Sequence, residues 1–507
     1  MRGPMNLSKF VALAAVIIAL AVAVGLTVVS STASFSSAVV ALTAMVITIA
    51  AFYSIEAGLM ALIFVACTDG FLKGLSPGWY TQVLKDYLLA LCLLRWAWMS
   101  VLGHRRESVH QRIVIPLVLF TMWVAMQMFN TTTHSMMLAL AGFRAWVIWI
   151  PVFFIAYDQI RTREQLERML TYITLLLVPI ALYTVVQYNI GYEHLYRLGP
   201  GFKTYAKAGY FTEDYEVETR PSATMISPHN DAAAMSCGIL AAAGGILFFR
   251  RRRLMLLATT VALPLEGVAM LLTAARAAFT STAFAALVLL VMVRRTGIAL
   301  VMALIIVVAV TQVGRLTGGR ALDRLTSVIT HAQDSINRAY LPWRMAVAYA
   351  RDHPLGSGVA TGHAAGRVIW GELRGKRGVA EPIPWAENEF GRSLIELGIP
   401  GLMLYIWMLY SVLKAIFASW RELQMPQYRW LAAGMISACI GVMGRLTVGA
   451  ALYTWPEAIF FWIFVAACMR LPQMEAEELE TAEEPAPAHA AAEPGRLQPA
   501  PAPGGGH

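Results

Sequence analysis

The sequence predicts an all-α integral membrane protein, a polytopic bundle of about 12–14 transmembrane helices with one large, ordered, helical loop outside the membrane. The composition is the first reason. Of 507 residues, 58% are hydrophobic and only 14% are charged, and a soluble domain could not bury that much apolar surface. The second reason is that apolar runs of roughly 20 residues, the length that crosses a bilayer, recur along the chain.

Fourteen apolar runs are candidate spans. They lie near 10–31, 36–54, 57–73, 83–102, 113–130, 137–157, 168–188, 231–249, 254–272, 277–293, 297–313, 394–417, 429–447 and 454–470. The first run is too long for the apolar part of a signal peptide and has no clear cleavage site, so we interpret it as a retained span. The run at 57–73 contains Asp69 and Lys73, and with its neighbour it could instead form a re-entrant element.

Charge and cysteine content exclude several other classes of protein. All five cysteines lie inside apolar runs, and their odd number predicts neither a disulfide framework nor a metal site. The net charge of +9 comes without any nucleic-acid-binding motif, so no nucleic-acid partner is expected. In a membrane protein this charge indicates basic loops that face anionic lipids and anionic substrates.

Short basic loops predict the orientation of the bundle. The segments 104–112, 161–168, 250–253 and 294–295 fall on one side if the fourteen spans alternate, together with both termini. The positive-inside rule makes that side cytoplasmic. The resulting parts are N-terminal transmembrane helices at 1–188, a first outer loop at 189–230, transmembrane helices at 231–313, a large outer loop at 314–392, C-terminal transmembrane helices at 393–470 and a disordered tail at 471–507.

The large outer loop, 314–392, has eleven Lys or Arg against seven Asp or Glu. Apolar residues recur in it at helical spacing, with Leu322 and Leu325 on one face and Tyr340 and Trp343 on another. We therefore expect two amphipathic helices on the outer surface. Their net charge of +4 indicates either a solvated face or a site for an anionic ligand.

Four arginines are candidate anion-binding residues. Arg276 is placed at a membrane boundary, where it either snorkels to the surface or binds an anion. Arg220 ends the first outer loop on the same side, and could equally pair with a loop carboxylate. Arg144 is expected roughly 10 Å below the outer boundary, to bind lipid phosphate or to serve the fold. Arg338 lies on an outer-loop helix that could simply rest on lipid headgroups.

The stretch "WAENEFGRSLIELGIPG" places Glu387 and Glu389 where the chain enters an apolar run. Carboxylates stabilise a helix N-terminus by about 0.3–1 kcal/mol, which alone could explain both residues. A carboxylate is also a competent general base, and arginines bind phosphate through forked hydrogen bonds. Together they describe an alcohol attacking a carbon whose leaving group is a phosphate or diphosphate. No ATP is available outside the membrane, so the donor would arrive attached to lipid.

Three stretches resemble the O-antigen ligase and Wzy-type polymerase superfamily, which are membrane glycosyltransferases of the bacterial envelope. They are "RPSATMISPHNDAA", "LTAARAAF" and the part from "NRAYLPWRMAVAYARDHPLGSGVATG" to "ENEFGRSLIELGIPG". The family pattern of His-Asn, nine residues and Gly-x-x-Gly is similar to Glu387, Asn388, Gly398 and Gly401 here. The family histidine is thus replaced by Glu387.

Two smaller departures occur in the first stretch. Ala223 stands where the family has glycine, and His229 is inserted between the family's proline and asparagine.

The resemblance implies roles for the candidate residues. Arg220 and Arg276 would hold the donor diphosphate, and Glu387 would be the base. The other substrate-binding candidates are Asn388, Glu389, Arg338 and Arg144. The implied reaction is inverting and needs neither metal nor cofactor.

The resemblance also implies partners and a place in the cell. The donor would be a polyprenyl-diphosphate-linked oligosaccharide and the acceptor a glycan or lipid A-core, with membrane lipids around the protein and a chain-length regulator as a further partner. The chain would be a multi-pass protein of the bacterial inner membrane that acts on the periplasmic face.

Three functions remain open. A polymerase extends an exopolysaccharide or O-antigen on its lipid carrier, and a ligase moves the glycan to lipid A-core or protein. The replaced histidine favours the polymerase. A polysaccharide transporter or flippase is less favoured, because transporters place charges near the midplane rather than at one boundary.

Overall fold

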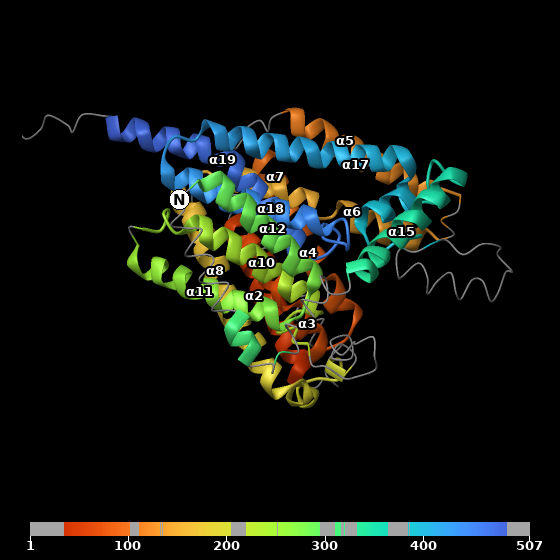
Figure 1. The fold of residues 1–507 in the computed structure, drawn as a ribbon, viewed down its shortest axis with the longest axis horizontal. Coiled ribbons are helices and arrows are strands. Elements are labelled where there is room, and N and C mark those ends of the chain that lie inside the picture. The colour runs from red at the N-terminus through yellow and green to blue at the C-terminus, as the bar shows by residue number, and fades with distance from the viewer. Residues whose placement is uncertain are drawn as a thin grey trace, which may run out of the picture.

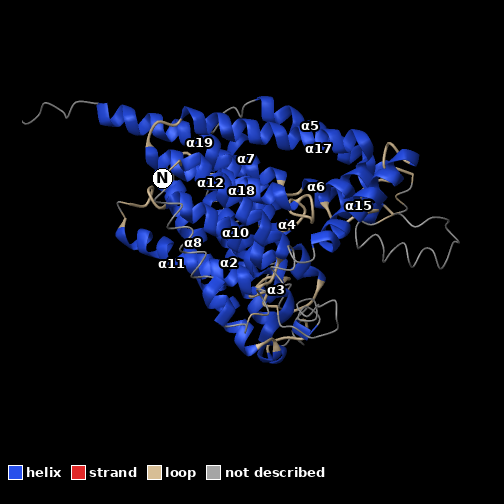
Figure 2. Ribbon diagram, viewed as in Figure 1, coloured by secondary structure: helices blue, strands red, loops and turns tan. Residues whose placement is uncertain are grey.

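The structure is a computed structural model that describes residues 35–101, 111–131, 133, 135–203, 220–250, 252–294, 310–315, 319, 332–362, 384 and 386–483. Side chains are not described at 35–39, 79–80, 100, 111–112, 332–339 and 482–483. These described parts contain helices and no strand (Figure 2). This confirms the predicted all-α membrane fold.

The helices follow one another through the described chain (Figure 1). They are α2 (Phe35–Tyr53), α3 (Ile55–Leu75), α4 (Trp79–Val101), α5 (Gln111–Met126), η1 (Gln127–Phe129), α6 (Met136–Val147), α7 (Ile150–Gln159), α8 (Arg163–Ile190), η2 (Glu193–Arg197), α10 (Pro228–Gly245), α11 (Arg253–Leu272), α12 (Arg276–Val293), α15 (Ala332–Asp352), α17 (Glu389–Glu422), α18 (Pro426–Arg445) and α19 (Glu457–Glu483).

Most predicted spans coincide with these helices. The span at 10–31 lies outside the described residues, and so does most of 297–313. By length and apolar character, six described helices can cross a membrane, or seven if α6 and α7, which meet at 40°, form one bent span. Other helices are shorter or more polar; α4, for example, carries Lys85, Asp86 and Arg95. The larger number of about 12–14 spans stays a prediction.

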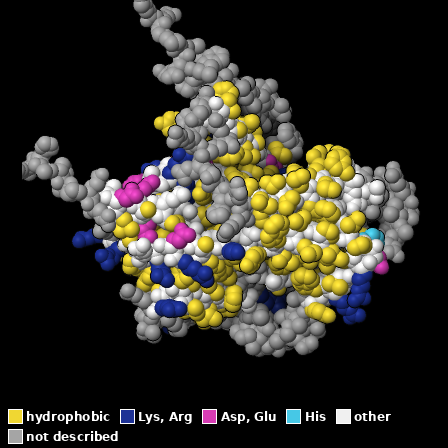
Figure 3. Space-filling model, turned by 90° about the horizontal axis from the view of Figure 1, so that it is seen from above, with side chains coloured by type: hydrophobic (Ala, Val, Ile, Leu, Met, Phe, Trp, Pro, Cys, Tyr) yellow, Lys and Arg dark blue, Asp and Glu magenta, His cyan; other side chains and the backbone are white. Residues whose placement is uncertain are grey.

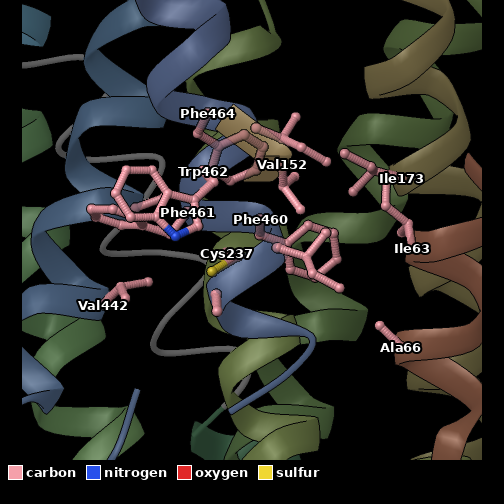
Figure 4. Close-up of a cluster of buried hydrophobic side chains, with 14 of the residues drawn as sticks. Ile63, Ala66, Val152, Ile173, Cys237, Val442, Phe460, Phe461, Trp462 and Phe464 are labelled. Carbon is pink, nitrogen blue, oxygen red and sulfur yellow. The ribbon is translucent and has the colours of Figure 1, made fainter. Parts of the chain in front are cut away.

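Helix α19 is the centre of the bundle. In its apolar stretch 83% of the residues are buried, against 28% in α12. Its aromatic side chains Phe460, Phe461, Trp462 and Phe464 pack among residues of α3, α7, α8, α10 and α18 (Figure 4). Because α19 is covered all round by other helices, it needs no polar face.

The outside of the bundle is also apolar. Large hydrophobic side chains are exposed on several helices, among them Leu182, Leu257, Phe284 and Tyr410. Figure 3 shows a broad apolar surface with Lys and Arg side chains around its margins. An apolar surface of this extent is unfavourable in water, so these side chains face lipid.

One end of the bundle gathers the basic loops. Arg252 Nη2 lies 2.6 Å from Glu167, which joins the start of α11 to the first turns of α8. Arg163 Nη1 lies 2.8 Å from Glu478 near the end of α19. The basic segments 161–168 and 250–253 therefore share one end of the molecule, as the alternation of spans requires.

The predicted tail differs from the structure at its beginning. The sequence predicts disorder from residue 471, whereas α19 remains helical to Glu483. The acidic residues that suggested disorder have partners: Glu475 accepts the backbone N–H groups of Gln424 and Met425, and Glu478 accepts the Tyr428 hydroxyl at 2.6 Å. Residues 484–507 of the predicted tail lie outside the described residues.

Helix α17 is kinked at Gly398, whose backbone has φ +71° and ψ −171°. This conformation is essentially restricted to glycine. A Cβ atom there would come within 2.4 Å of the backbone of the segment 354–356. The kink leaves carbonyl groups of α17 without helical partners, and three other groups satisfy them: Ser357 N and Gly358 N at 2.9 and 3.0 Å, and the indole N–H of Trp123 at 2.9 Å. The short first part of α17 is thereby held at the end of the bundle.

Candidate functional site

The segment 446–456, between α18 and α19, joins the ends of several helices. Its backbone N–H groups donate to Glu389 at the start of α17. The carbonyl of Trp455 accepts the side-chain amide of Asn230 in the first turn of α10, and its indole N–H donates to Asp69 of α3 at 2.9 Å. The starts of α10 and α17 and the second half of α3 therefore meet at the end of the bundle opposite the basic loops.

The two carboxylates of the motif lie in different surroundings. Glu387 is exposed and directly precedes α17. Asn388 is the N-cap of α17, and its side-chain oxygen accepts the backbone N–H of Gly391 at 2.5 Å. The helix is thus capped by the residue between the two glutamates. Glu387 has no part in that cap and is accessible to a substrate.

Glu389 is 1% exposed and holds the segment 446–456 in place. Its Oε2 accepts the backbone N–H groups of Ala451 and Leu452 at 2.8 and 3.0 Å. Its Oε1 accepts the Tyr405 hydroxyl at 2.7 Å. The sequence interpretation assigned Glu389 to capping or sugar binding, and its described contacts are with the protein itself.

Arg220 contacts the turn between α11 and α12, and Arg276 follows this turn. Arg220 is 5% exposed, and its Nε donates to the carbonyl of Thr273 at 3.0 Å. Arg276 follows three residues later as the first residue of α12, and it is partly exposed. The structure therefore brings Arg220 to the turn that precedes Arg276, although the two arginines, which were predicted to act on one anion, are distant in the sequence.

The backbone beside these arginines is strained where the family has glycine. Ala223 has φ +48°, in the left-handed region that glycine adopts without cost. The side-chain amide oxygen of Gln187 stabilises this turn by accepting hydrogen bonds from the backbone N–H groups of Ser222 and Ala223 at 2.9 and 2.7 Å. The family's glycine is thus explained by backbone geometry, and the hydrogen bonds that Gln187 accepts compensate for its replacement.

Sequence reasoning missed a buried charge cluster next to this site. Asp69 and Lys73 of α3 form an ion pair at 2.6 Å, and Lys85 of α4 lies 3.7 Å from the same carboxylate. The Lys85 ammonium stands 3.5 Å from the centre of the Trp455 ring. Charged residues inside the apolar run 57–73 were the available signal, but the partners on α4 and near α19 could not be found without the fold.

Arg144 is engaged with a carboxylate. Its Nε and Nη2 both lie 2.6 Å from Asp86 Oδ2, so α6 is tied to α4. The Arg144 side chain keeps 40% of its surface exposed. Arg144 can therefore hold α6 against α4 through Asp86 and still present part of its side chain to a ligand.

Helix α15 packs against the first part of α17. Trp343 stacks on Phe390 with ring centres 6.2 Å apart, and Ala346 and Ala350 complete the contact face. Tyr340, which the helical pattern grouped with Trp343, is exposed instead. Arg338 belongs to α15 but its side chain lies outside the described residues, as does the face predicted around Leu322.

Two more ionisable residues of α17 belong to the site. Glu396 accepts the indole N–H of Trp146 at 2.7 Å and the backbone N–H groups of Ala360 and Gly362 at 3.0 and 3.1 Å. Arg392 is 4% exposed and lies beneath the segment 446–456. Residues 389, 392 and 396 recur at spacings of three and four, which places them on one helical face. The spacing of these three residues was the signal in the sequence that could have identified them.

No group of His, Cys, Asp or Glu side chains suited to hold a metal ion occurs within the described ranges. The ionisable groups of the candidate site are therefore the exposed carboxylate of Glu387, the arginines Arg220 and Arg276 near the α11–α12 turn, and buried ion pairs between the surrounding helices.

Fold and site together define a polytopic helical membrane protein with two arginines near the α11–α12 turn and an exposed carboxylate at Glu387. A protein-family model described as O-antigen ligase, Wzy_C, matches residues 260–406, which include Arg276, Glu387 and the kink at Gly398. This match over part of the chain supports the O-antigen ligase and Wzy superfamily, whose members are ligase- or polymerase-type glycosyltransferases that act on a glycan donor and an acceptor. A comparison with curated proteins gives no match.

Proposed function

We propose that the protein is an inner-membrane glycosyltransferase that uses a polyprenyl-diphosphate-linked glycan on the periplasmic face, as a Wzy-type polysaccharide polymerase. The observation that supports this most is the hydrogen bond from Arg220 to Thr273 in the α11–α12 turn, three residues before Arg276. Two guanidinium groups at one boundary suit a diphosphate better than any neutral ligand. Arg276 also lies inside the region that matches the family model.

In the proposed reaction an acceptor hydroxyl attacks the anomeric carbon of the donor glycan. The new C–O bond forms as the bond from that carbon to the diphosphate breaks, with inversion. Glu387 takes the hydroxyl proton, because it is the exposed carboxylate of the motif. Arg220 and Arg276 stabilise the negative charge on the departing polyprenyl diphosphate. The scheme needs no metal ion or cofactor, since a base and a stabilised leaving group suffice.

The other proposed contributors have supporting roles. Asn388 caps the helix that presents Glu387, and Glu389 fixes the adjoining segment 446–456. Arg144 and Arg338 are retained as candidates for contact with the donor or with lipid headgroups.

The alternative is a ligase that transfers the glycan to lipid A-core or to protein, and the family match is compatible with either enzyme. Both enzymes would share the donor, the arginines and the base. A transporter or flippase is less well supported, since the site residues gather at one end of the bundle. A chain-length regulator is a proposed partner of the polymerase alone.

The test is glycan output from a strain that lacks the chromosomal gene and carries wild type, Glu387→Gln, Glu387→His or Glu389→Gln, at matched membrane levels. We expect Glu387→Gln to abolish the product and Glu387→His to retain part of it. Accumulation of single lipid-linked repeats supports a polymerase, and accumulation of long lipid-linked chains supports a ligase. Normal product from Glu387→Gln would overturn the assignment of the base.

A further inference from the structure

Two nitrogens of the buried Arg392 guanidinium, Nε and Nη1, have no hydrogen-bond partner in the described structure. The residue is 4% exposed. A buried N–H donor that is left unpaired loses its interaction with water and gains nothing in return. An acceptor brought from outside the chain would therefore stabilise this side chain.

The two nearest carboxylates on α17 do not fill this need. Glu389 and Glu396 lie three residues before and four residues after Arg392, on the same face of the helix. Both oxygens of Glu389 accept hydrogen bonds from Tyr405 or the segment 446–456, and both oxygens of Glu396 accept from Trp146 or the segment 360–362. Neither forms a described ion pair with Arg392. They balance its charge from a distance and leave its N–H donors available.

Tyr453 keeps the guanidinium in a fixed orientation. The Arg392 Cζ lies 4.3 Å from the centre of the Tyr453 ring. A guanidinium stacked on an aromatic face keeps its N–H bonds in its own plane, where they can reach a ligand beside the ring. Tyr453 is only half-buried, so the contact lies close to the surface.

The local charge selects the kind of ligand. Around Tyr453 the carboxylates of Glu389 and Glu396 are matched by the guanidinium groups of Arg392 and Arg144, so the charges there balance. A ligand bound there need not carry charge, in contrast to the diphosphate proposed for Arg220 and Arg276. Sugar hydroxyl groups accept hydrogen bonds from a guanidinium without bringing charge, and an aromatic ring can pack against a sugar ring.

We propose that Arg392 and Tyr453 form a subsite for a neutral sugar residue of the acceptor glycan. The proposal rests on the proposed function, because it assigns the sugar to the acceptor. Arg392 lies in the first two turns of α17, five residues after the exposed Glu387. A sugar held there is on the side of the base, while the donor diphosphate is held at the α11–α12 turn.

The test measures glycan binding without any transfer step. Purified protein in lipid nanodiscs is titrated with the free oligosaccharide that mild acid releases from the lipid-linked repeats of the host strain, and saturation-transfer NMR gives the Kd. We expect Arg392→Gln and Tyr453→Leu to weaken binding by about 10- to 100-fold, the loss of one or two hydrogen bonds to a charged donor. Arg392→Lys, which keeps the charge but not the fork, should fall between wild type and Arg392→Gln.

Arg252→Gln is the matched control, because Arg252 is an exposed arginine at the opposite end of the bundle. It should bind the oligosaccharide like wild type, and so should Arg276→Gln. Wild-type binding in Arg392→Gln would overturn the proposal. So would displacement of the oligosaccharide by inorganic diphosphate that depends on Arg392, since the residue would then bind phosphate.

The outcomes also separate this proposal from the proposed function. If oligosaccharide binding depends on Arg392 but Glu387→Gln still makes normal product, the sugar subsite is supported and the assignment of Glu387 as the base is overturned. Loss of product in Glu387→Gln together with unchanged binding in Arg392→Gln would support Glu387 as the base and overturn the sugar subsite.

Discussion

Glu387 and Glu389 are two residues apart, yet the structure predicts opposite consequences for their removal. Glu389→Ala leaves three buried donors without an acceptor: the backbone N–H groups of Ala451 and Leu452 and the hydroxyl of Tyr405. At about 1–2 kcal/mol for each unsatisfied donor, the protein should lose about 3–6 kcal/mol of stability. Glu387→Ala removes an exposed side chain and should change stability by less than about 0.5 kcal/mol.

The assay is thermal aggregation of the purified protein in nanodiscs, followed by size-exclusion chromatography. Glu389→Ala should aggregate at a clearly lower temperature than wild type, and Glu387→Ala at the same temperature. Glu389→Gln should lie close to wild type, because its carbonyl oxygen can accept both backbone N–H groups and its amide can donate to the Tyr405 oxygen. Wild-type stability in Glu389→Ala would refute the idea that this carboxylate anchors the segment 446–456.

Four further predictions follow from the fold. Gly398→Ala should lower the free energy of unfolding by about 1–3 kcal/mol through backbone conformation alone, and by more through the clash. Its level in the membrane should fall, whereas that of the control Ile399→Ala should not. Trp455→Phe loses the hydrogen bond to Asp69 and should lower stability by about 1 kcal/mol, seen as a lower aggregation temperature. Trp455→Ala should lower it further, because the two buried lysines also lose their contact with the ring. Deleting 484–507 should leave membrane levels unchanged, whereas a deletion that extends through 471–483 should lower them, as in-gel fluorescence of a tagged protein would show. A fluorescent protein that folds only in the cytoplasm should fluoresce when fused to the C-terminus, and a dark fusion at normal membrane levels would contradict the predicted orientation.

Much of the fold was predictable because lipid imposes a simple rule. A chain that crosses a bilayer must satisfy its backbone within each segment, so long apolar runs become helices. The runs from 36–54 to 277–293 and from 394–417 to 454–470 are helical as predicted. The error at 471 arose because an acidic sequence resembles a solvated tail, whereas Glu475 and Glu478 have partners on other helices.

The candidate site was predictable only in part. Spacing identified Glu387, Asn388 and the glycines Gly398 and Gly401 as one motif, because all of them lie in one stretch of chain. The kink at Gly398 explains why the motif requires a glycine. Arg392 and Glu396 were missed, since their roles depend on Tyr453 and Trp146, which are distant in the sequence.

The sequence by itself determined the class of this protein: an apolar, polytopic helical chain with arginines and carboxylates at one boundary. These features follow from composition and from spacing within single segments. Only the tertiary structure decided which carboxylate is free. Glu387 and Glu389 have the same side chain and nearly the same position, but the segment 446–456 folds over one of them and leaves the other exposed. The physical reason is that burial and hydrogen bonding are properties of contacts between distant segments, which no local pattern contains.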